Sequence, residues 1–172
     1  MIGDTPDTGT SVTFLPDADI FTETIYQYDI LQSRMRELAY LNKNITITLT
    51  DRRVAAANGD FKIDSFHSTT GLNEFVQYLD SAREPLIPTV IHMDGERDDI
   101  PVDVALHYNT SYTENIHSYV NNINTIEGGT HLAGFRRGLT CTLKKYAEDS
   151  GLLAKEKVEI SGDDFREGLT AV

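Results

Sequence analysis

The spacing of apolar residues changes abruptly near residue 42, and this change constrains the fold more than any other feature of the chain. Over residues 28–42 the apolar side chains recur every three or four positions, which predicts an amphipathic helix. Immediately afterwards Ile45, Ile47 and Leu49 alternate with threonines, which predicts a half-buried strand. Helix and strand periods within one chain indicate a mixed α+β fold.

The same mixture continues on both sides of this segment. Alternating residues predict a strand from Thr10 to Leu15, and further strands are expected at 61–63, 89–93, 102–108, 119–123 and 169–172. Asp94-Gly95 is the predicted turn between two of these strands. Helices are predicted at 72–81, from Thr130 and from Asp163-Asp164, with Thr130 as an N-cap. The helix from Thr130 should turn five side chains inward: Leu132, Phe135, Leu139, Leu143 and Tyr146.

A polar stretch suggests a division of the chain. Residues 51–53 and 55–60 lack a clear period and are interpreted as a loop or linker. We therefore expect a first unit at residues 1–53, a linker at 54–60 and a second unit at 61–172.

The charge distribution is uneven. The chain has 172 residues and a net charge of −12, which argues against a surface that binds DNA everywhere. Between Thr130 and Tyr146, however, there are four cations and no acid, which leaves the rest of the chain at −16. Arg136, Thr140 and Lys144 form one polar stripe of the predicted helix. A phosphate-facing surface and an ordinary solvated helix face are equally good interpretations.

Two glycine motifs also have two readings each. Gly128-Gly129 precedes the basic helix and could admit an anion to the helix N-terminus, but a tight turn is the favoured reading. Gly9-Thr10 at the head of the first strand is most simply a turn glycine followed by a β-favouring residue.

Several classes of site are not predicted. The five histidines and one cysteine have no ligand spacing, so no metal site is expected. Neither a phosphate-binding P-loop nor a nucleophile elbow nor a dinucleotide fingerprint is present. We expect no signal peptide and no membrane-spanning helix, and the single cysteine suits a reducing compartment such as the cytoplasm.

Six stretches, in order and with natural spacing, resemble the B subunits of type IIA topoisomerases, and their wording is closer to gyrase than to topoisomerase IV. They are the segments GTSVTFLPD at 9–17, RELAYLN at 36–42, GLNEFV at 71–76, SYTENI at 111–116, VNNINTIEGGTHLAGFR at 120–136 and DFREGLTAV at 164–172. The resemblance covers nearly the whole chain.

The resemblance implies that the first unit is the C-terminal strand–helix–strand part of a Bergerat (GHKL) ATP-binding domain. The second unit would be a β-α-β transducer domain, truncated at its C-terminal end. It implies that Thr10, next to Gly9, contacts the adenine side of ATP. It also implies that Arg136 lines a cavity through which DNA passes, and the basic helix adds Arg137 and Lys144 as DNA-facing candidates.

For the intact subunit the resemblance implies an ATP-hydrolysing DNA topoisomerase with ATP and Mg²⁺ as cofactors. Its partners would be DNA, the gyrase A subunit and a second B subunit joined through ATP-dependent dimerisation. The family's catalytic glutamate and metal-binding asparagine lie upstream of the 9–17 motif, and Met1 stands at an interior family position. We therefore expect no catalytic residue, bound cofactor or activity in this piece alone. A topoisomerase IV B subunit and a stand-alone nucleic-acid- or protein-binding module are the alternatives.

Overall fold

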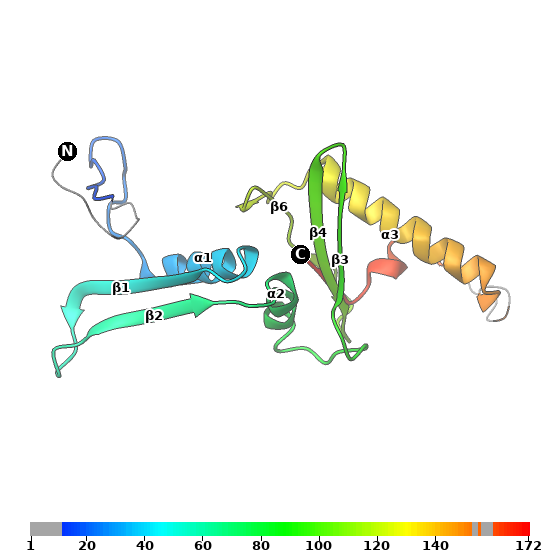
Figure 1. Ribbon diagram of the computed structural model, residues 1–172, viewed down its shortest axis with the longest axis horizontal. Helices are drawn as coiled ribbons and strands as arrows, with labels where there is room; N and C mark the ends of the chain where they lie inside the picture. The colour runs from blue at the N-terminus through cyan, green and yellow to red at the C-terminus, as the bar shows by residue number, and fades with distance from the viewer. Residues whose placement is uncertain (1–11, 153–154, 156–159) are drawn as a thin grey trace.

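The computed structural model describes residues 12–152, 155 and 160–172 (Figure 1). The chain begins with α1 (Tyr28–Leu41), β1 (Thr46–Ala55), β2 (Phe61–His67) and α2 (Leu72–Leu79). It continues with β3 (Ile91–Arg97), β4 (Ile100–Tyr108), β5 (Asn115–Ile116), β6 (Tyr119–Val120) and β7 (Ile123–Asn124). The last elements are α3 (Thr130–Asp149), the 3-10 helix η1 (Asp164–Arg166) and β8 (Leu169–Ala171). The mixed α+β class is confirmed.

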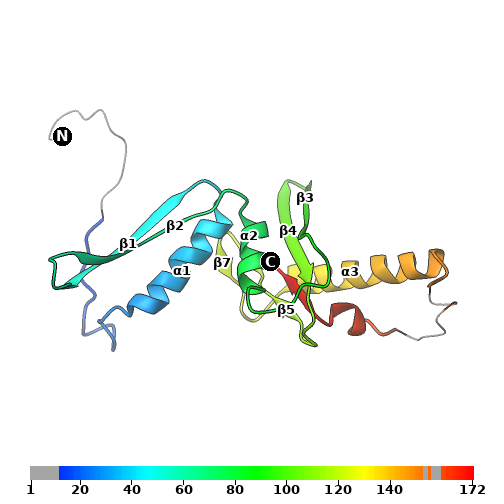
Figure 2. The ribbon, with the colours of Figure 1, turned by 90° about the horizontal axis from the view of Figure 1, so that it is seen from below.

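Helix α1 lies along the hairpin of β1 and β2 (Figure 2). The hydroxyl of Tyr28 donates to Asp64 Oδ2 at 2.7 Å, and the amide of Gln32 donates to the same oxygen at 2.9 Å. Desolvation and the hydrogen bond to the Asp64 carboxylate raise the pKa of Tyr28 to about 12. These contacts fix the helix on one face of the hairpin.

The loop predicted for residues 51–53 and 55–60 is wrong in its first part, because β1 continues to Ala55 and only residues 56–60 turn. This end of the hairpin is solvated, so a strand there needs no apolar alternation. Arg53 folds back on Asp51, with Nη2 at 2.6 Å from Oδ2. The linker at 54–60 stays a prediction, but the pairing of β1 with β2 groups β2 with the first unit.

The strand predicted from Thr10 to Leu15 is wrong for its described part. Residues 12–15 have no regular structure, and Val12, Phe14 and Leu15 are exposed. A strand needs a neighbour to accept and donate its backbone hydrogen bonds, and no described strand pairs with this segment.

The second half of the chain forms a four-stranded sheet in the order β3-β4-β8-β5, in which only β5 and β8 are parallel. Consecutive residues of a strand point to opposite faces. Ala105 accordingly packs with Leu72 and Val76 of α2, whereas the next residue, Leu106, packs on the side of α3. The two helices therefore cover opposite faces of the sheet.

Two tight turns differ from the predicted pattern. Asp94-Gly95 lies within β3, and the turn to β4 is formed by Asp98 and Asp99, with φ of 54° and 60°. The single strand predicted at 119–123 is a hairpin that turns at Asn121 and Asn122, with φ of 50° and 65°. A type I′ hairpin turn has two left-handed residues, as both of these turns do, and Asp and Asn tolerate that conformation better than other non-glycine residues.

A polar and aromatic contact joins α1 to the second half. Arg34 Nη2 donates to the carbonyl oxygen of Asn122 at 2.5 Å, and the Asn122 amide donates to Asn42 Oδ1 at 3.1 Å. The rings of Tyr40 and Phe75 stack with centroids 5.2 Å apart. The contact holds the β6–β7 hairpin, which leads into α3, against the end of α1.

Candidate nucleic-acid interface

Helix α3 begins directly after Gly128 and Gly129, whose φ angles are 77° and 155°. The φ of Gly129 favours glycine, and a Cβ there would also have to displace the His131 ring, which would lie 2.8 Å away. Gly129 occupies the N-cap position and Thr130 is the first helical residue. The prediction of Thr130 as an N-cap is therefore wrong by one residue. The His131 ring contacts Thr125 Oγ1 at 3.0 Å, which ties the helix start to the segment after β7.

The packing of α3 separates its buried side from its charged side. Phe135 and Leu139 pack against Leu106, Leu169 and Ala171 of the sheet, as the predicted inward face requires. Tyr146, predicted to face inward, is 66% exposed, because the far half of α3 extends beyond the sheet (Figure 1).

The predicted cations lie on the outside of α3. Arg137 and Lys144 are exposed, and neither forms an ion pair among the residues that the structure describes. The exposed Cys141 lies between them, at one helical turn from each. The stripe of Arg136, Thr140 and Lys144 is only partly solvated, because Thr140 Oγ1 accepts a hydrogen bond from Arg166 at 3.2 Å.

Arg136 is held by an acidic residue from another element. Its Nε donates to Glu114 Oε1 at 2.7 Å, and 42% of its side chain is exposed. Arg166 of η1 approaches the same oxygen, with Nε at 3.5 Å. This Nε forms no well-directed hydrogen bond, so the contact with Glu114 is electrostatic. Arg166 Nη1 donates to the carbonyl oxygen of Gly162 at 2.7 Å.

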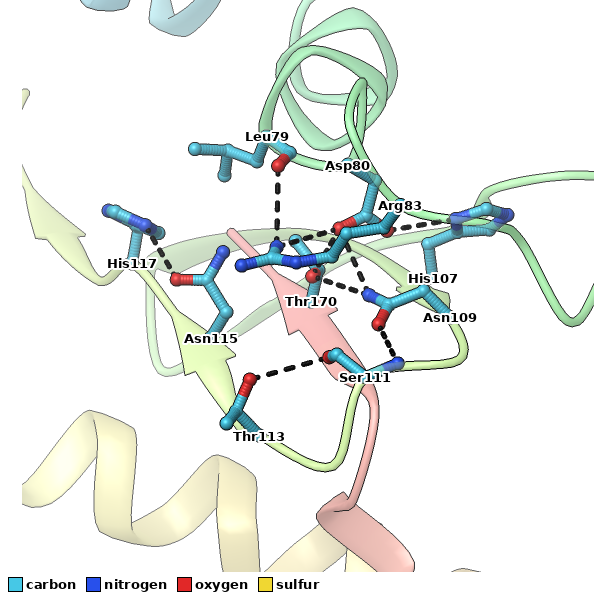
Figure 3. Close-up of polar contacts among 10 residues, drawn as sticks. All are labelled: Leu79, Asp80, Arg83, His107, Asn109, Ser111, Thr113, Asn115, His117 and Thr170. Carbon is cyan, nitrogen blue, oxygen red and sulfur yellow. Dashed lines mark hydrogen bonds and ion pairs between the residues drawn. The ribbon is translucent and has the colours of Figure 1, made fainter.

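On the opposite face of the sheet, a buried carboxylate organises a second polar cluster (Figure 3). Asp80 follows α2 and is 6% exposed. Its Oδ1 accepts from Thr170 at 2.6 Å, from Asn109 at 3.0 Å and from Arg83 at 3.2 Å. Its Oδ2 lies 3.1 Å from His107 Nδ1. Four residues from β4, β8 and the segments after α2 and β4 therefore converge on one side chain.

The electrostatics of this cluster favour a charged Asp80. Burial by itself would raise the pKa of Asp80, but the hydrogen bonds from Thr170, His107, Asn109 and Arg83 outweigh burial and lower it. The other nitrogen of His107, Nε2, lies 2.8 Å from the carbonyl oxygen of Ile87. Both ring nitrogens of His107 therefore have a hydrogen-bond partner, and neither is free to serve as a base. The cluster ties the end of α2 to β4 and β8.

The Asp80 cluster also holds the loop that carries Glu114. Asn109 donates to Asp80 and to Thr170 Oγ1, while its own Oδ1 accepts from the backbone N–H of Ser111 at 2.9 Å. Thr113 Oγ1 then donates to Ser111 Oγ at 3.3 Å (Figure 3). The next residue is Glu114, so the buried cluster and the α3 cation are linked through one short loop.

Sequence reasoning did not identify this cluster. Asp80, His107, Asn109 and Thr170 have no characteristic spacing, and Asp80 resembles any other acid at a helix end. Glu114 was also missed as the partner of Arg136, which is 22 residues away. The only usable signal was that both Glu114 and Arg136 fall within motifs shared with a known family.

The predicted nucleotide contacts Gly9 and Thr10 lie outside the described residues. Among the described residues, no three His, Cys, Asp or Glu side chains gather in a way that could hold a metal ion. No helix in the described part of the chain is both long and apolar enough to cross a membrane.

Comparison with known proteins gives consistent matches. The model of the DNA gyrase B family matches residues 71–172. The DNA gyrase B protein of Cytophaga hutchinsonii is 61% identical over 171 residues, which are 99% of this chain and 36% of that protein. The DNA gyrase B protein of Halalkalibacterium halodurans is 47% identical over 173 residues, which are 100% of this chain and 26% of that protein. The chain thus spans 36% of the length of the first relative and 26% of the length of the second.

Solved structures agree with the sequence matches. The 43K ATPase domain of Thermus thermophilus gyrase B, crystallised with an aminocoumarin, superposes with a TM-score of 0.76 at 29% identity. That match covers 91% of this chain and 41% of the solved one. The gyrase B structure from Myxococcus xanthus gives a TM-score of 0.74 at 25% identity, covering 97% of this chain and 47% of that one. The sequence and the fold lead to one conclusion: the chain belongs to the DNA gyrase B family.

Proposed function

We propose that the intact protein is an ATP-hydrolysing type II DNA topoisomerase of the gyrase kind, and that this chain transmits its nucleotide state toward DNA. The family membership and the contact between α1 and the β6–β7 hairpin support the proposal, because that contact is a direct path from the first unit to α3. The polar bonds of Asn122 with Arg34 and Asn42 would carry a movement of α1 into the loop that starts α3.

The nucleotide side of the proposal rests on the first unit. ATP and Mg²⁺ would bind in the intact protein, with Gly9 and Thr10 at the adenine side, while residues 61–172 would act as the transducer. That boundary at residue 61 separates β2 from its partner β1, so the pairing favours moving the start of the transducer to a point after β2, close to Gly71, where the family model begins. The partners would be DNA, the gyrase A subunit and a second copy of the gyrase B protein, in the cytoplasm.

The DNA side of the proposal rests on α3, and the carrying observation is its cationic surface. Arg136, Arg137 and Lys144 extend over about two turns of one helix in an otherwise acidic chain. Cations spaced along a helix suit the regular phosphates of a duplex and read no base sequence. We therefore assign to these three side chains a sequence-independent contact with a DNA segment.

The test is the response of ATP hydrolysis to DNA in a full-length protein reconstituted with its gyrase A partner. Arg137→Gln and Lys144→Gln should each weaken the stimulation by linear duplex and reduce its salt dependence by a slope of about one per lost phosphate contact. Lys62→Gln, an exposed cation on β2, is the matched control and should leave the curve unchanged. Superimposable curves for all variants and wild type at two salt concentrations would show that α3 is only a solvated surface.

A further inference from the structure

The carboxylate of Glu114 lies between two guanidinium groups at the place where α3, η1 and the loop after β4 meet. It is 2.7 Å from Arg136 Nε and 3.5 Å from Arg166 Nε. The Glu114 side chain is 26% exposed, so water screens this group less than it would a free surface pair. The site thus contains two cations and one shared anion.

The two arginines depend on Glu114 to different degrees. Arg166 also donates to the carbonyl oxygen of Gly162 and to Thr140, and it pairs with Asp163. Arg136 has Glu114 as its one ion-pair partner among the described residues. Removing the Glu114 charge would therefore leave Arg166 compensated and release Arg136.

We propose that Glu114 is an internal counter-ion that competes with DNA phosphate for Arg136 and so sets the DNA concentration at which the enzyme responds. This inference rests on the proposed function, because it takes α3 as the DNA-facing surface. Glu114 contacts the Nε edge of Arg136, which places the guanidinium and cancels its charge. A phosphate must displace the carboxylate or bind an arginine that is already neutralised.

The strength of the pair suits such a competition. A partly exposed ion pair is weak, so a closely approaching phosphate can overcome it. A guanidinium has five N–H donors, so phosphate can approach its free edge before the carboxylate leaves. The contact would hold Arg136 in place without trapping it.

Glu114 is placed by the buried side of the domain rather than by the surface alone. The loop from Asn109 to Thr113 is bonded internally and anchored to Asp80 through the Asn109 amide. These bonds hold the backbone that leads to Glu114, which places the start of its side chain next to Arg136. The contact with Arg136 is therefore a built feature of the domain.

The test is a double-mutant cycle in the full-length protein reconstituted with its gyrase A partner, with ATPase rate measured against linear duplex concentration. Glu114→Gln should lower the half-saturating DNA concentration by about three- to five-fold at low salt, the range of one partly exposed ion pair. The same change in an Arg136→Gln background should produce no shift, because the competing cation is gone. In an Arg137→Gln background the shift should persist, because Arg137 does not contact Glu114.

Glu148→Gln is the charge control. It removes one negative charge from α3 about 18 Å along the helix from Arg136, and it should produce no comparable shift. Glu114→Ala, checked for folding by circular dichroism, must reproduce the effect of Glu114→Gln. An unchanged response of both Glu114 variants, or an equal shift with and without Arg136, overturns the counter-ion proposal but leaves the proposed role of α3 intact. If Arg136→Gln and Arg137→Gln also match wild type at every DNA concentration, the proposed role of α3 fails instead.

Discussion

Replacing Asp80 with asparagine tests how far one buried charge organises the second half of the chain. The carboxylate accepts from four donors, on Thr170, Asn109, Arg83 and His107. An asparagine keeps the volume but has one acceptor oxygen and an NH₂ group with two donors. The NH₂ group must then lie where one of the carboxylate oxygens lay. One orientation keeps the amide oxygen toward Thr170, Asn109 and Arg83 and turns the amide nitrogen toward His107, and the other loses the group of three bonds; the negative charge is lost in both.

The structure allows the magnitude to be worked out. Hydrogen bonds to a charged group contribute about 1.5–3 kcal/mol each, and removal of one member of a buried ion pair costs about 3–5 kcal/mol. Asp80 is 6% exposed, so little of this is recovered from water. We expect Asp80→Asn to reduce the free energy of unfolding by about 3 kcal/mol at pH 7. Asp94→Asn, at an exposed acid of β3, should change it by about 0.5 kcal/mol or less.

The measurement is urea denaturation of the wild type and both variants at several pH values. The fold lowers the pKa of Asp80, so its contribution is present above the unfolded value of about 3.9 and is lost as the pH falls through the folded value. The difference in free energy of unfolding between wild type and Asp80→Asn should therefore shrink below about pH 4. A loss of unfolding free energy at pH 7 no larger than the loss caused by Asp94→Asn would refute the reasoning.

Local structure supports three more predictions. Backbone amides of Val102–Tyr108 in β4 should exchange more slowly than those of Ile45–Leu49, because Ala105 and Leu106 of β4 are paired on both sides, whereas β2 is the one described neighbour of β1; equal protection would contradict the account. Gly168→Ala should destabilise the chain by about 2 kcal/mol or more in thermal unfolding, since φ is +71° and a Cβ would lie 2.3 Å from the Asn109 carbonyl oxygen. Gly134→Ala, in open space within α3, should instead stabilise it by about 0.5–1 kcal/mol. Titration calorimetry of the 172-residue chain with a non-hydrolysable ATP analogue should detect no micromolar binding, because one neutral hydrogen bond from Thr10 contributes on the order of 1 kcal/mol.

Periodicity predicted the elements that have one clearly apolar face. The helices at 28–41 and 72–79 follow their sequence patterns closely, because each packs its apolar face against a neighbour. The strand at 100–108 is also found where alternation predicted it, although Ala105 and Leu106 are buried on opposite faces of the sheet. Periodicity failed where the structure depends on backbone pairing. Ala55 belongs to a strand because Phe61 pairs with it, and the chain turns at Asp98 and Asp99 because both residues adopt left-handed conformations.

The site was predicted from local sequence and is built from distant contacts. The cations of α3 could be found by counting charges along one helix. Glu114 lies 22 residues from Arg136, and Thr170, Asn109 and His107 lie 27 to 90 residues from Asp80, so neither set of contacts has a local pattern. Only Arg83, three residues after Asp80, is a local partner. Counting charges therefore located the cationic helix but overestimated the free charge of Arg136.

The most direct measurement of the central claim is whether α3 touches DNA. Cys141 is exposed on α3 between Arg137 and Lys144 and is the single cysteine of these 172 residues. A photoactivatable cross-linker can be attached to it after any other cysteines of the full-length protein are replaced. In the reconstituted enzyme with a non-hydrolysable ATP analogue, the account predicts cross-links from position 141 to duplex DNA, and none from a cysteine placed at the exposed Asn58 in the β1–β2 turn. Equal cross-linking from both positions, or none from position 141 while DNA is bound, would contradict it.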